Sequence, residues 1–253
     1  MAPSHCTEAT ASARFAIAAV LALVMFLWPA VAAAEGQRVR LELLLAVDGS
    51  SSVSDAEFDL QMEGLARAFE DPAVQAAIGE LGAPGLAVGL MQWSSLEAQA
   101  LAVDWTRVVG PGDARALAAR IRGVGRVIQG GATSLSAAMA TALAAIEHNS
   151  FAGERRVIDV SGDGRANEGE SPALPRAAAL AAGITVNGLA ILNEDPALAD
   201  YYLAWVVGGP DSFLMTAGDY RDFAEAIRLK LIREIQGPPI AAAPRQRLYG
   251  ALP

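Results

Sequence analysis

Short hydrophobic runs recur along the chain, and most are bounded by glycine or polar residues. Runs of Leu, Ile, Val and Ala with few breaks are typical of strands buried on both faces, as in the middle of a parallel sheet. One run, residues 99–108, follows its neighbour after only the short turn 94–97, so we expect it to be an antiparallel edge strand. The predicted strands cover residues 41–48, 85–93, 99–108, 155–161, 184–192 and 213–215.

The segments between these runs place apolar residues three and four positions apart, which predicts amphipathic helices. Ser54 can cap the first helix, and Pro72 suits the first turn of the second. The predicted helices cover residues 55–69, 72–78, 113–122, 134–147, 172–182, 196–206 and 219–236. Strands that alternate with helices predict an α/β fold, a doubly wound and mostly parallel sheet with helices on both faces.

The N-terminal segment differs in composition from the rest of the chain. Residues 15–34 carry no charge, follow Arg14 and close on three alanines. This is the order of a secretory signal peptide, so we expect cleavage after the last of these alanines. A length of about 20 residues also suits a retained membrane anchor, which is the alternative. We therefore expect a signal peptide over residues 1–34, a domain over 35–236 and a flexible tail over 237–253, in a periplasmic or secreted protein.

Charge and cysteine content narrow the class of protein. The formal net charge is −9, and an acidic surface argues against nucleic acid, whose phosphates require clustered lysines and arginines. Cys6 is the only cysteine and lies in the expected signal peptide, so the exported domain would contain no disulfide. Its stability then has to come from a hydrophobic core.

The strand predicted over residues 41–48 ends in the first candidate for a functional site. Asp48 closes the hydrophobic run, and Ser50 and Ser52 follow at alternate positions. Open α/β sheets bind ligands at the carboxyl ends of their strands. One carboxylate and two hydroxyls from a tight loop supply the oxygen ligands that Mg²⁺ prefers. The alternative is a plain turn that caps the following helix.

Two further loops offer oxygen ligands. Thr133 lies at a helix start after a glycine-rich loop, and Asp163 lies just past a hydrophobic strand, as Asp48 does. The pattern Asp48-x-Ser50-x-Ser52, Gly131-Ala132-Thr133 and Asp163-Gly164 resembles the metal-ion-dependent adhesion site of the von Willebrand factor type A (vWA) domain. The phrases RRVIDVSGDG, GITVNGLAI, YYLAWVVGGPDSF and FAEAIRLKLIREI are similar to a bacterial vWA-like family of unknown function. The resemblance covers about residues 39–235.

This resemblance implies a six-strand sheet with one antiparallel edge strand and a divalent cation at its carboxyl edge. Ser50 and Ser52 would bind the ion directly, Thr133 directly or through water, and Asp48 and Asp163 mostly through water. Few direct carboxylates leave the ion with residual positive charge, so an acidic group from a protein partner can complete an octahedral shell. We therefore expect a binding domain rather than an enzyme, with Mg²⁺ as the ion and Mn²⁺ or Ca²⁺ as alternatives.

One position departs from the family pattern. Gly162 precedes Asp163, where many type A domains carry threonine. Ser161 is the alternative source of a hydroxyl near this point.

A second metal-binding pattern overlaps the third loop. Residues 159–170 fit the spacing of an EF-hand calcium loop, but an EF-hand needs a helix before the loop and this segment follows a strand. A second calcium ion near Asn167 and Glu168 is a related alternative. Asp159 lies in the middle of the predicted strand, so we expect it to be paired or to orient Ser50 or Ser52 from behind.

Enzyme motifs are missing from the sequence. Haloacid-dehalogenase-type phosphatases need a second Asp two residues after the first, where this chain has Ser50, and there is no G-x-S-x-G or Walker motif.

His148 is the only histidine after the signal peptide, and we expect it to cap a helix. We expect Trp93, Trp105 and Trp205 to be packing residues. The alternatives to a binding domain are a metal-dependent hydrolase using the same carboxylates and a structural domain whose site holds no ion.

Overall fold

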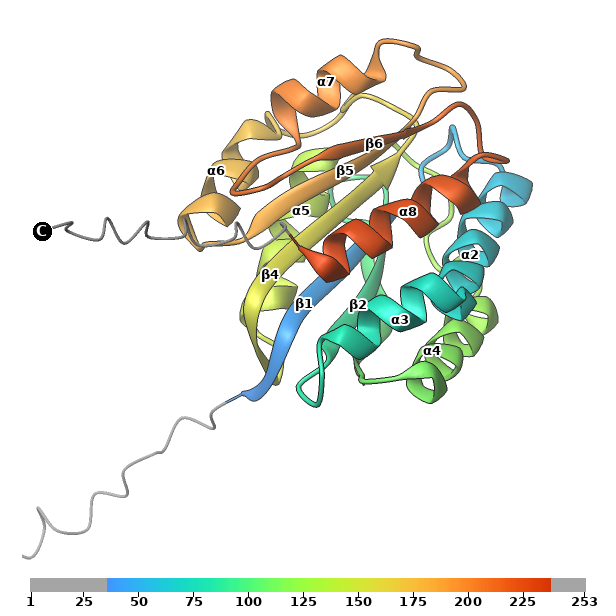
Figure 1. Ribbon diagram of the computed structural model, residues 1–253. Helices are drawn as coiled ribbons and strands as arrows, with labels where there is room; N and C mark the ends of the chain where they lie inside the picture. The colour runs from blue at the N-terminus through green and yellow to red at the C-terminus, as the bar shows by residue number, and fades with distance from the viewer. Residues whose placement is uncertain (1–35, 238–253) are drawn as a thin grey trace, which may run out of the picture. The chain divides into compact units, whose positions relative to one another are not determined.

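The hydrophobic runs form one six-stranded sheet in the computed structural model, which describes residues 36–237. The strand order is β3-β2-β1-β4-β5-β6, with β3 antiparallel to β2 and the other neighbours parallel (Figure 1). This confirms the predicted fold class and edge strand. The expected signal peptide and residues 238–253 of the expected tail lie outside the described residues. The strands are β1 (Gln37–Asp48), β2 (Leu86–Trp93), β3 (Gln99–Val108), β4 (Phe151–Gly162), β5 (Thr185–Ile191) and β6 (Leu214–Ala217).

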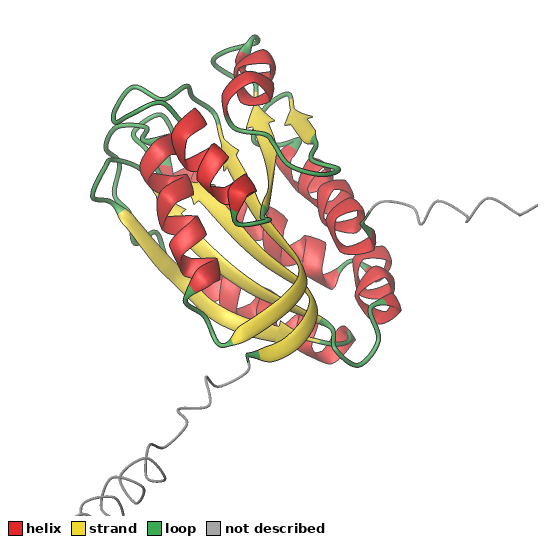
Figure 2. Cartoon of the chain, turned by 90° about the vertical axis from the view of Figure 1, so that its left-hand side faces the viewer, coloured by secondary structure: helices red, strands yellow, loops and turns green. Residues whose placement is uncertain are grey.

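The helices cover both faces of the sheet (Figure 2). α2 begins with a capping box, in which the Ser54 side chain accepts from the Glu57 N–H and the Glu57 carboxylate accepts from the Ser54 N–H. The Asp71 carboxylate caps α3 by accepting the N–H groups of Ala73 and Val74, and Pro72 lies in the first turn. The helices are α2 (Asp55–Glu70), α3 (Pro72–Glu80), α4 (Pro111–Gly123), α5 (Leu135–Glu147), α6 (Ala173–Ala181), α7 (Leu198–Trp205) and α8 (Phe223–Gln236).

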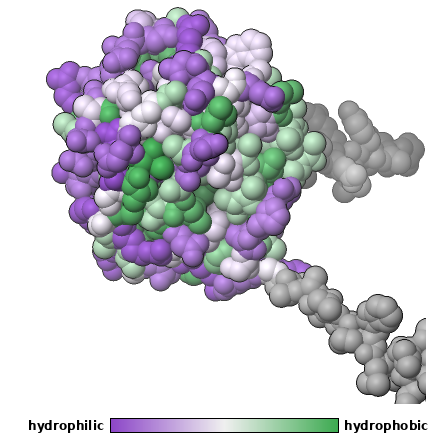
Figure 3. Space-filling view, turned by 180° about the vertical axis from the view of Figure 1, so that it is seen from behind, coloured by the Kyte–Doolittle hydropathy of each residue, from purple (hydrophilic) through white to green (hydrophobic). Residues whose placement is uncertain are grey.

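Two hydrophobic cores hold the layers together. Leu43 and Leu45 of β1 face the core beneath α2, α3, α4 and α8, whereas Leu44 and Ala46 face the core beneath α5, α6 and α7. Because this part of β1 is buried on both faces, every position from Leu43 to Val47 is apolar. The face seen from behind is mainly hydrophilic, with hydrophobic patches between the polar side chains (Figure 3). Among residues 36–237, no helix has the length and apolar character to cross a membrane.

The order of the strands places a topological switch point at the carboxyl end of β1. The chain moves from β1 to β2 on one side, and β4 adds on the other side, so the direction of winding reverses between β1 and β4. Ligand sites of open α/β sheets lie at such a switch point. The register pairs Asp48 with Trp93 and Val47 with Ser161, so all three strands end at the same level.

The starts of three elements differ by four residues from the prediction. β1 and β4 each begin four residues earlier than expected, because Gln37 pairs with Phe151 and extends the parallel ladder. The last helix begins at Phe223 and not at residue 219, because the Asp219 carboxylate accepts the N–H groups of Arg221 and Asp222 in a turn.

A buried charge cluster fastens α8 to the sheet. The Lys230 ammonium is fully buried, lies 2.7 Å from Asp159 Oδ1 on β4 and pairs with Glu234 one turn further along α8. Asn187 of β5 donates to Glu234 Oε1 at 3.0 Å. Burial raises the pKa of Asp159 to about 7, and the negative charge of Glu234 adds to this effect. Asp159 is therefore paired, as one of the two predictions for it required.

We expect Asp159 to make stability depend on pH. In the unfolded chain its proton leaves near pH 4, but in the folded protein it stays until about pH 7. Folding therefore takes up a proton between these values, and the free energy of unfolding should fall as pH rises through this window, by on the order of 2–4 kcal/mol.

Asp159→Asn should remove this contribution, as measured by urea denaturation in chelator at several pH values. Asp200→Asn, on an exposed part of α7, is the control and should keep the wild-type profile. An Asp159→Asn profile parallel to that of the wild type would contradict the assignment.

Candidate functional site

The first loop folds back on the end of β1. Asp48 is fully buried, and its Oδ1 accepts the Ser50 N–H at 2.7 Å. This contact turns the chain so that the hydroxyls of Ser50 and Ser52 lie 3.1 Å apart. The Gly49 N–H donates to the carbonyl of Trp93, which ties the loop to the end of β2. Three of the five predicted site residues therefore share one small turn.

The third loop meets the first across the switch point. Asp163 follows β4 directly and is 1% exposed. The Ser52 hydroxyl donates to Asp163 Oδ1 at 2.7 Å. This bond joins residues 111 positions apart, and it exists because β1 and β4 end side by side.

The second loop is bonded to both of the others. The Gly131 N–H donates to Ser51 Oγ at 2.8 Å, and the Ser51 N–H donates to the Gly131 carbonyl at 2.9 Å. The Thr133 N–H donates to Asn167 Oδ1 at 2.8 Å, and the Asn167 N–H donates back to the Thr133 carbonyl at 3.0 Å. Gly131 adopts φ +106°, which only glycine adopts without strain. The structure thus brings all five predicted residues to one place; their binding of a metal stays a prediction.

The electrostatics of this place suit a cation. Asp48 Oδ2 and Asp163 Oδ2 are both buried and have no hydrogen-bond partner among the described residues. Burial raises the pKa of Asp48 to about 7, and the charge of Asp163 contributes to this shift. No group of three or more His, Cys, Asp or Glu side chains that could hold a metal occurs within residues 36–237. A metal here would instead rely on two carboxylates and three hydroxyls.

The glycine that departs from the vWA pattern has a steric cause. A Cβ at Gly162 would come within 2.8 Å of both Asp48 Oδ2 and the Tyr202 hydroxyl oxygen. Tyr202 comes from α7, is fully buried, and has no hydrogen-bond partner for its hydroxyl among the described residues. Burial raises the pKa of Tyr202 well above its ordinary value, so the hydroxyl keeps its proton. The alternative source, Ser161, instead donates to the Ala46 carbonyl at 3.3 Å.

Arg126 is a second residue that the sequence did not point to. It lies in the loop before α5, and its guanidinium donates to the carbonyls of Gly49 at 2.9 Å and Ser50 at 3.1 Å. It also pairs with Asp55 at 2.8 Å and lies over the Phe58 ring. Only 11% of its side chain is exposed. Arg126 therefore holds the backbone of the first loop through the carbonyls of Gly49 and Ser50.

The structure decides three other expectations. Asp159 lies inside β4 and pairs with α8, so the EF-hand alternative is wrong. His148 is exposed and lies at the end of α5, with Nδ1 2.9 Å from the Ala144 carbonyl, as expected of a cap. Trp93 and Trp105 pack against the core, but Trp205 is 44% exposed, so the packing prediction was wrong for Trp205. Trp205 ends α7, where its side chain has no covering layer.

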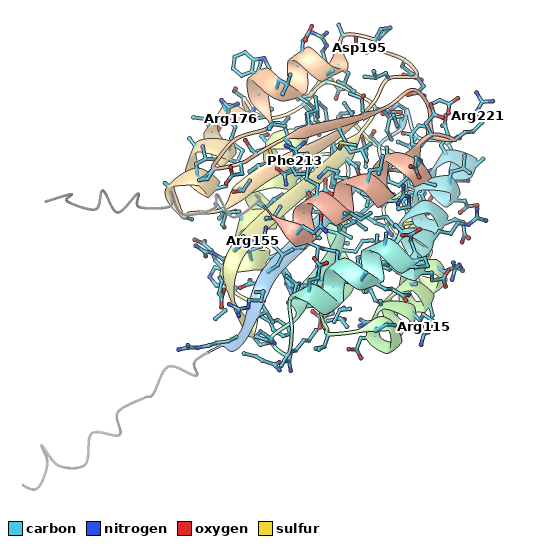
Figure 4. The ribbon with its side chains drawn as sticks, viewed as in Figure 1. Arg115, Arg155, Arg176, Asp195, Phe213 and Arg221 are labelled. Atoms are coloured by element: carbon cyan, nitrogen blue, oxygen red, sulfur yellow. The ribbon has the colours of Figure 1, made fainter. Side chains whose placement is uncertain are left out.

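A hollow of about 470 Å³ lies at the opposite edge of the sheet. Arg155 and Phe213 line it, whereas Asp195 and Arg221 lie on loops at the carboxyl edge (Figure 4). The Arg155 guanidinium donates to the carbonyls of Glu234 and Ile235, so it caps the end of α8. None of the five candidate residues lines this hollow.

Sequence comparison assigns the chain to a family. The profile of a family described as protein of unknown function (DUF1194) matches residues 38–239, which is most of the chain. The chain belongs to the DUF1194 family. No curated protein matches it significantly.

Solved structures show the fold of this DUF1194 protein. Proximal thread matrix protein 1 (PTMP1) from the mussel byssus is 17% identical, with a TM-score of 0.56 over 80% of this chain and 48% of that one. The pilus adhesin SpaC from Lactobacillus rhamnosus GG is 15% identical, with a TM-score of 0.56 over 80% and 31%. The vWF domain of the type V pili tip protein Mfa5 from Porphyromonas gingivalis is 14% identical, with a TM-score of 0.53 over 80% and 98%. The chain therefore has the vWA fold.

The coverage of these structures differs. This DUF1194 protein spans about half the length of PTMP1 and about a third of SpaC, but nearly all of the Mfa5 domain. One PTMP1 structure has a zinc-occupied metal-ion-dependent adhesion site motif.

We expect Gly162→Ala to destabilise this DUF1194 protein, because the new methyl group would overlap Asp48 Oδ2 and the Tyr202 hydroxyl. Overpacking of this kind costs about 1–3 kcal/mol in the free energy of unfolding. The cost should be smaller in a Tyr202→Phe background, which removes one of the two oxygens.

The control for this change is Gly164→Ala, whose new Cβ would lie 3.7 Å from Thr133 Oγ1, an ordinary contact distance. Denaturant unfolding of the single and double variants measures the coupling. An equal cost of Gly162→Ala in both backgrounds would show that the Tyr202 hydroxyl does not occupy this space.

We expect Arg126→Met to loosen the first loop, because the carbonyls of Gly49 and Ser50 lose their shared donor. The free energy of unfolding should fall by about 1–3 kcal/mol, and the amide of Ser51, which donates to the Gly131 carbonyl, should exchange faster with solvent. Arg115→Met, at an exposed position of α4, is the matched control. Hydrogen exchange at Ser51 that is unchanged in Arg126→Met would refute this role.

Proposed function

We propose that this protein is a vWA-like binding domain that uses a divalent cation to hold an acidic group of a protein partner. Ser50 and Ser52 would bind the cation directly, and Thr133 would bind it directly or through water. Asp48 and Asp163 would act mostly through water. Mg²⁺ suits an all-oxygen shell of this kind, and Mn²⁺ or Ca²⁺ are the alternatives. The expected signal peptide would place the domain in the periplasm or outside the cell.

One observation carries this proposal. Two buried carboxylates, Asp48 and Asp163, each keep an oxygen with no hydrogen-bond partner among the described residues. Neither carboxylate forms a salt bridge with a described lysine or arginine. Burying charge without compensation costs several kcal/mol, and a bound cation with its water ligands removes that cost. Asp48 belongs to the loop that carries Ser50 and Ser52, and the other oxygen of Asp163 accepts the Ser52 hydroxyl at 2.7 Å.

The residues of this chain determine what the bound ion could do. Hydroxyls are neutral ligands, so the ion would keep most of its positive charge toward an incoming carboxylate. The network from Ser51, Gly131, Asn167 and Arg126 holds the loops in place before binding, which lowers the entropy lost on association. The zinc-occupied motif in PTMP1 and the description of SpaC as a pilus adhesin support a metal-dependent binding role.

Asp48→Ala and Asp163→Ala should each weaken Mg²⁺ binding by about 10–100-fold, as expected for partners that orient a metal and its waters. Isothermal titration calorimetry measures the affinity, and circular dichroism checks that the fold survives. Asp200→Ala is the control, because Asp200 is exposed on α7 and should not affect the metal.

Two outcomes would reject the proposal. Mg²⁺ affinity that both Asp48→Ala and Asp163→Ala leave unchanged would exclude this site. Phosphatase or protease turnover by the wild type that is lost in Asp48→Ala would instead assign the same carboxylates to a hydrolase.

A further inference from the structure

A hollow of about 400 Å³ lies beside the candidate site, between the loop that follows β4 and the helix α7. Tyr201 and Trp205, one turn apart on α7, line it together with Pro172 at the start of α6. The hollow is shallow and open to solvent, so it suits a single side chain rather than an enclosed ligand. Asn167, which also lines the hollow, is bonded to Thr133 in both directions, so the hollow and the candidate site share one loop.

The charge of this hollow is negative. Glu168 and Glu170 line it, and neither forms a salt bridge with a described lysine, arginine or histidine. Glu168 Oε2 accepts the Leu96 N–H at 2.8 Å, which fixes this carboxylate in place. Arg165 comes from the same loop but pairs with Asp195 at 2.7 Å and lies over the Tyr201 ring. No described cation therefore neutralises Glu168 or Glu170, and a cation in the hollow would do so.

The aromatic side of the hollow is open to solvent. Trp205 is 44% exposed, and exposure of a large aromatic ring next to a hollow is typical of a contact surface. A guanidinium can stack on an indole face and donate two parallel hydrogen bonds to a carboxylate at the same time. The methylene groups of the same side chain can pack on Pro172. An arginine side chain thus satisfies the acidic, aromatic and apolar parts of the hollow together.

We propose that this hollow binds an arginine side chain of the partner whose acidic group reaches the neighbouring candidate site. The inference rests on the proposed function, because it adds a second contact to the same partner. It predicts that the acidic residue and the arginine lie close together on the partner surface. Recognition would then require both charges, which explains how one domain could select among the many proteins that display carboxylates.

Short peptides with one glutamate and one arginine test the pairing. We would use acetylated and amidated glycine peptides with one to four residues between the two, and matched peptides with citrulline, which has nearly the shape of arginine without its charge. At the best spacing and in Mg²⁺, the arginine peptide should bind at least about tenfold more tightly, as measured by calorimetry. A lysine peptide should fall between the two.

Substitutions in the hollow test whether it is the place where the arginine of the peptide binds. Glu170→Gln and Trp205→Ala should remove the advantage of arginine over citrulline but leave Mg²⁺ affinity unchanged. Glu194→Gln and Leu203→Ala are the controls, since both residues are exposed and neither lines the hollow. Equal binding of arginine and citrulline peptides at every spacing, or an advantage that survives in both hollow variants, would overturn the inference.

A second measurement separates this inference from the metal proposal. Acetyl-arginine-amide alone, without metal, should shift the indole N–H resonance of Trp205 at millimolar concentration, and acetyl-citrulline-amide should not. If Mg²⁺ does not bind but this shift occurs, the proposed function fails and the hollow remains an arginine site. If Mg²⁺ binds but arginine causes no shift and no gain in peptide affinity, the hollow inference fails alone.

Discussion

The structure depends on a constraint that follows from placing two carboxylates inside the fold. Asp48 and Asp163 end neighbouring parallel strands, both are buried, and no described cation neutralises them. Folding must therefore either keep a proton on Asp48, whose pKa rises to about 7, or provide a positive charge from outside the chain. The described residues therefore supply no positive charge to balance the two carboxylates of the site. A divalent cation with oxygen ligands would balance their charge. The hydroxyls of Ser50, Ser52 and Thr133 are ligands of this kind.

The rest of the edge keeps these groups in position. Pairs of hydrogen bonds between Ser51 and Gly131, and between Thr133 and Asn167, join loops that are far apart in sequence. Arg126 adds a buried cation, but it is directed at backbone carbonyls and at Asp55, and so does not neutralise the two site carboxylates. Further along β4 from the site, Lys230 lies against Asp159 and also pairs with Glu234, so one buried cation serves two buried carboxylates. The fold therefore contains one acidic cluster with a buried lysine and one that no described cation reaches.

The close approach of Tyr202 to Gly162 accounts for the one position where this chain departs from the vWA pattern. The phenol hydroxyl from α7 occupies the space that a larger residue at 162 would fill, and it lies next to the free oxygen of Asp48. Leu198, one turn before Tyr202 on α7, is buried. Trp205, about one turn after Tyr202, is open to solvent beside the hollow. The helix thus supplies both a buried support for the candidate site and an exposed wall for a neighbouring contact.

The sequence alone determined the α/β class, the edge strand and five candidate residues. Hydrophobic runs and helical spacing report burial of the local backbone, and the residues after a strand's end have a defined place once the sheet is parallel. The tertiary structure alone decided which side chains support those residues. Arg126 lies in a stretch that reads as an ordinary loop, and Tyr202 and Trp205 belong to one short helix in which one ring is buried and the other exposed. Their roles depend on distances between segments remote in sequence, and only packing sets those distances.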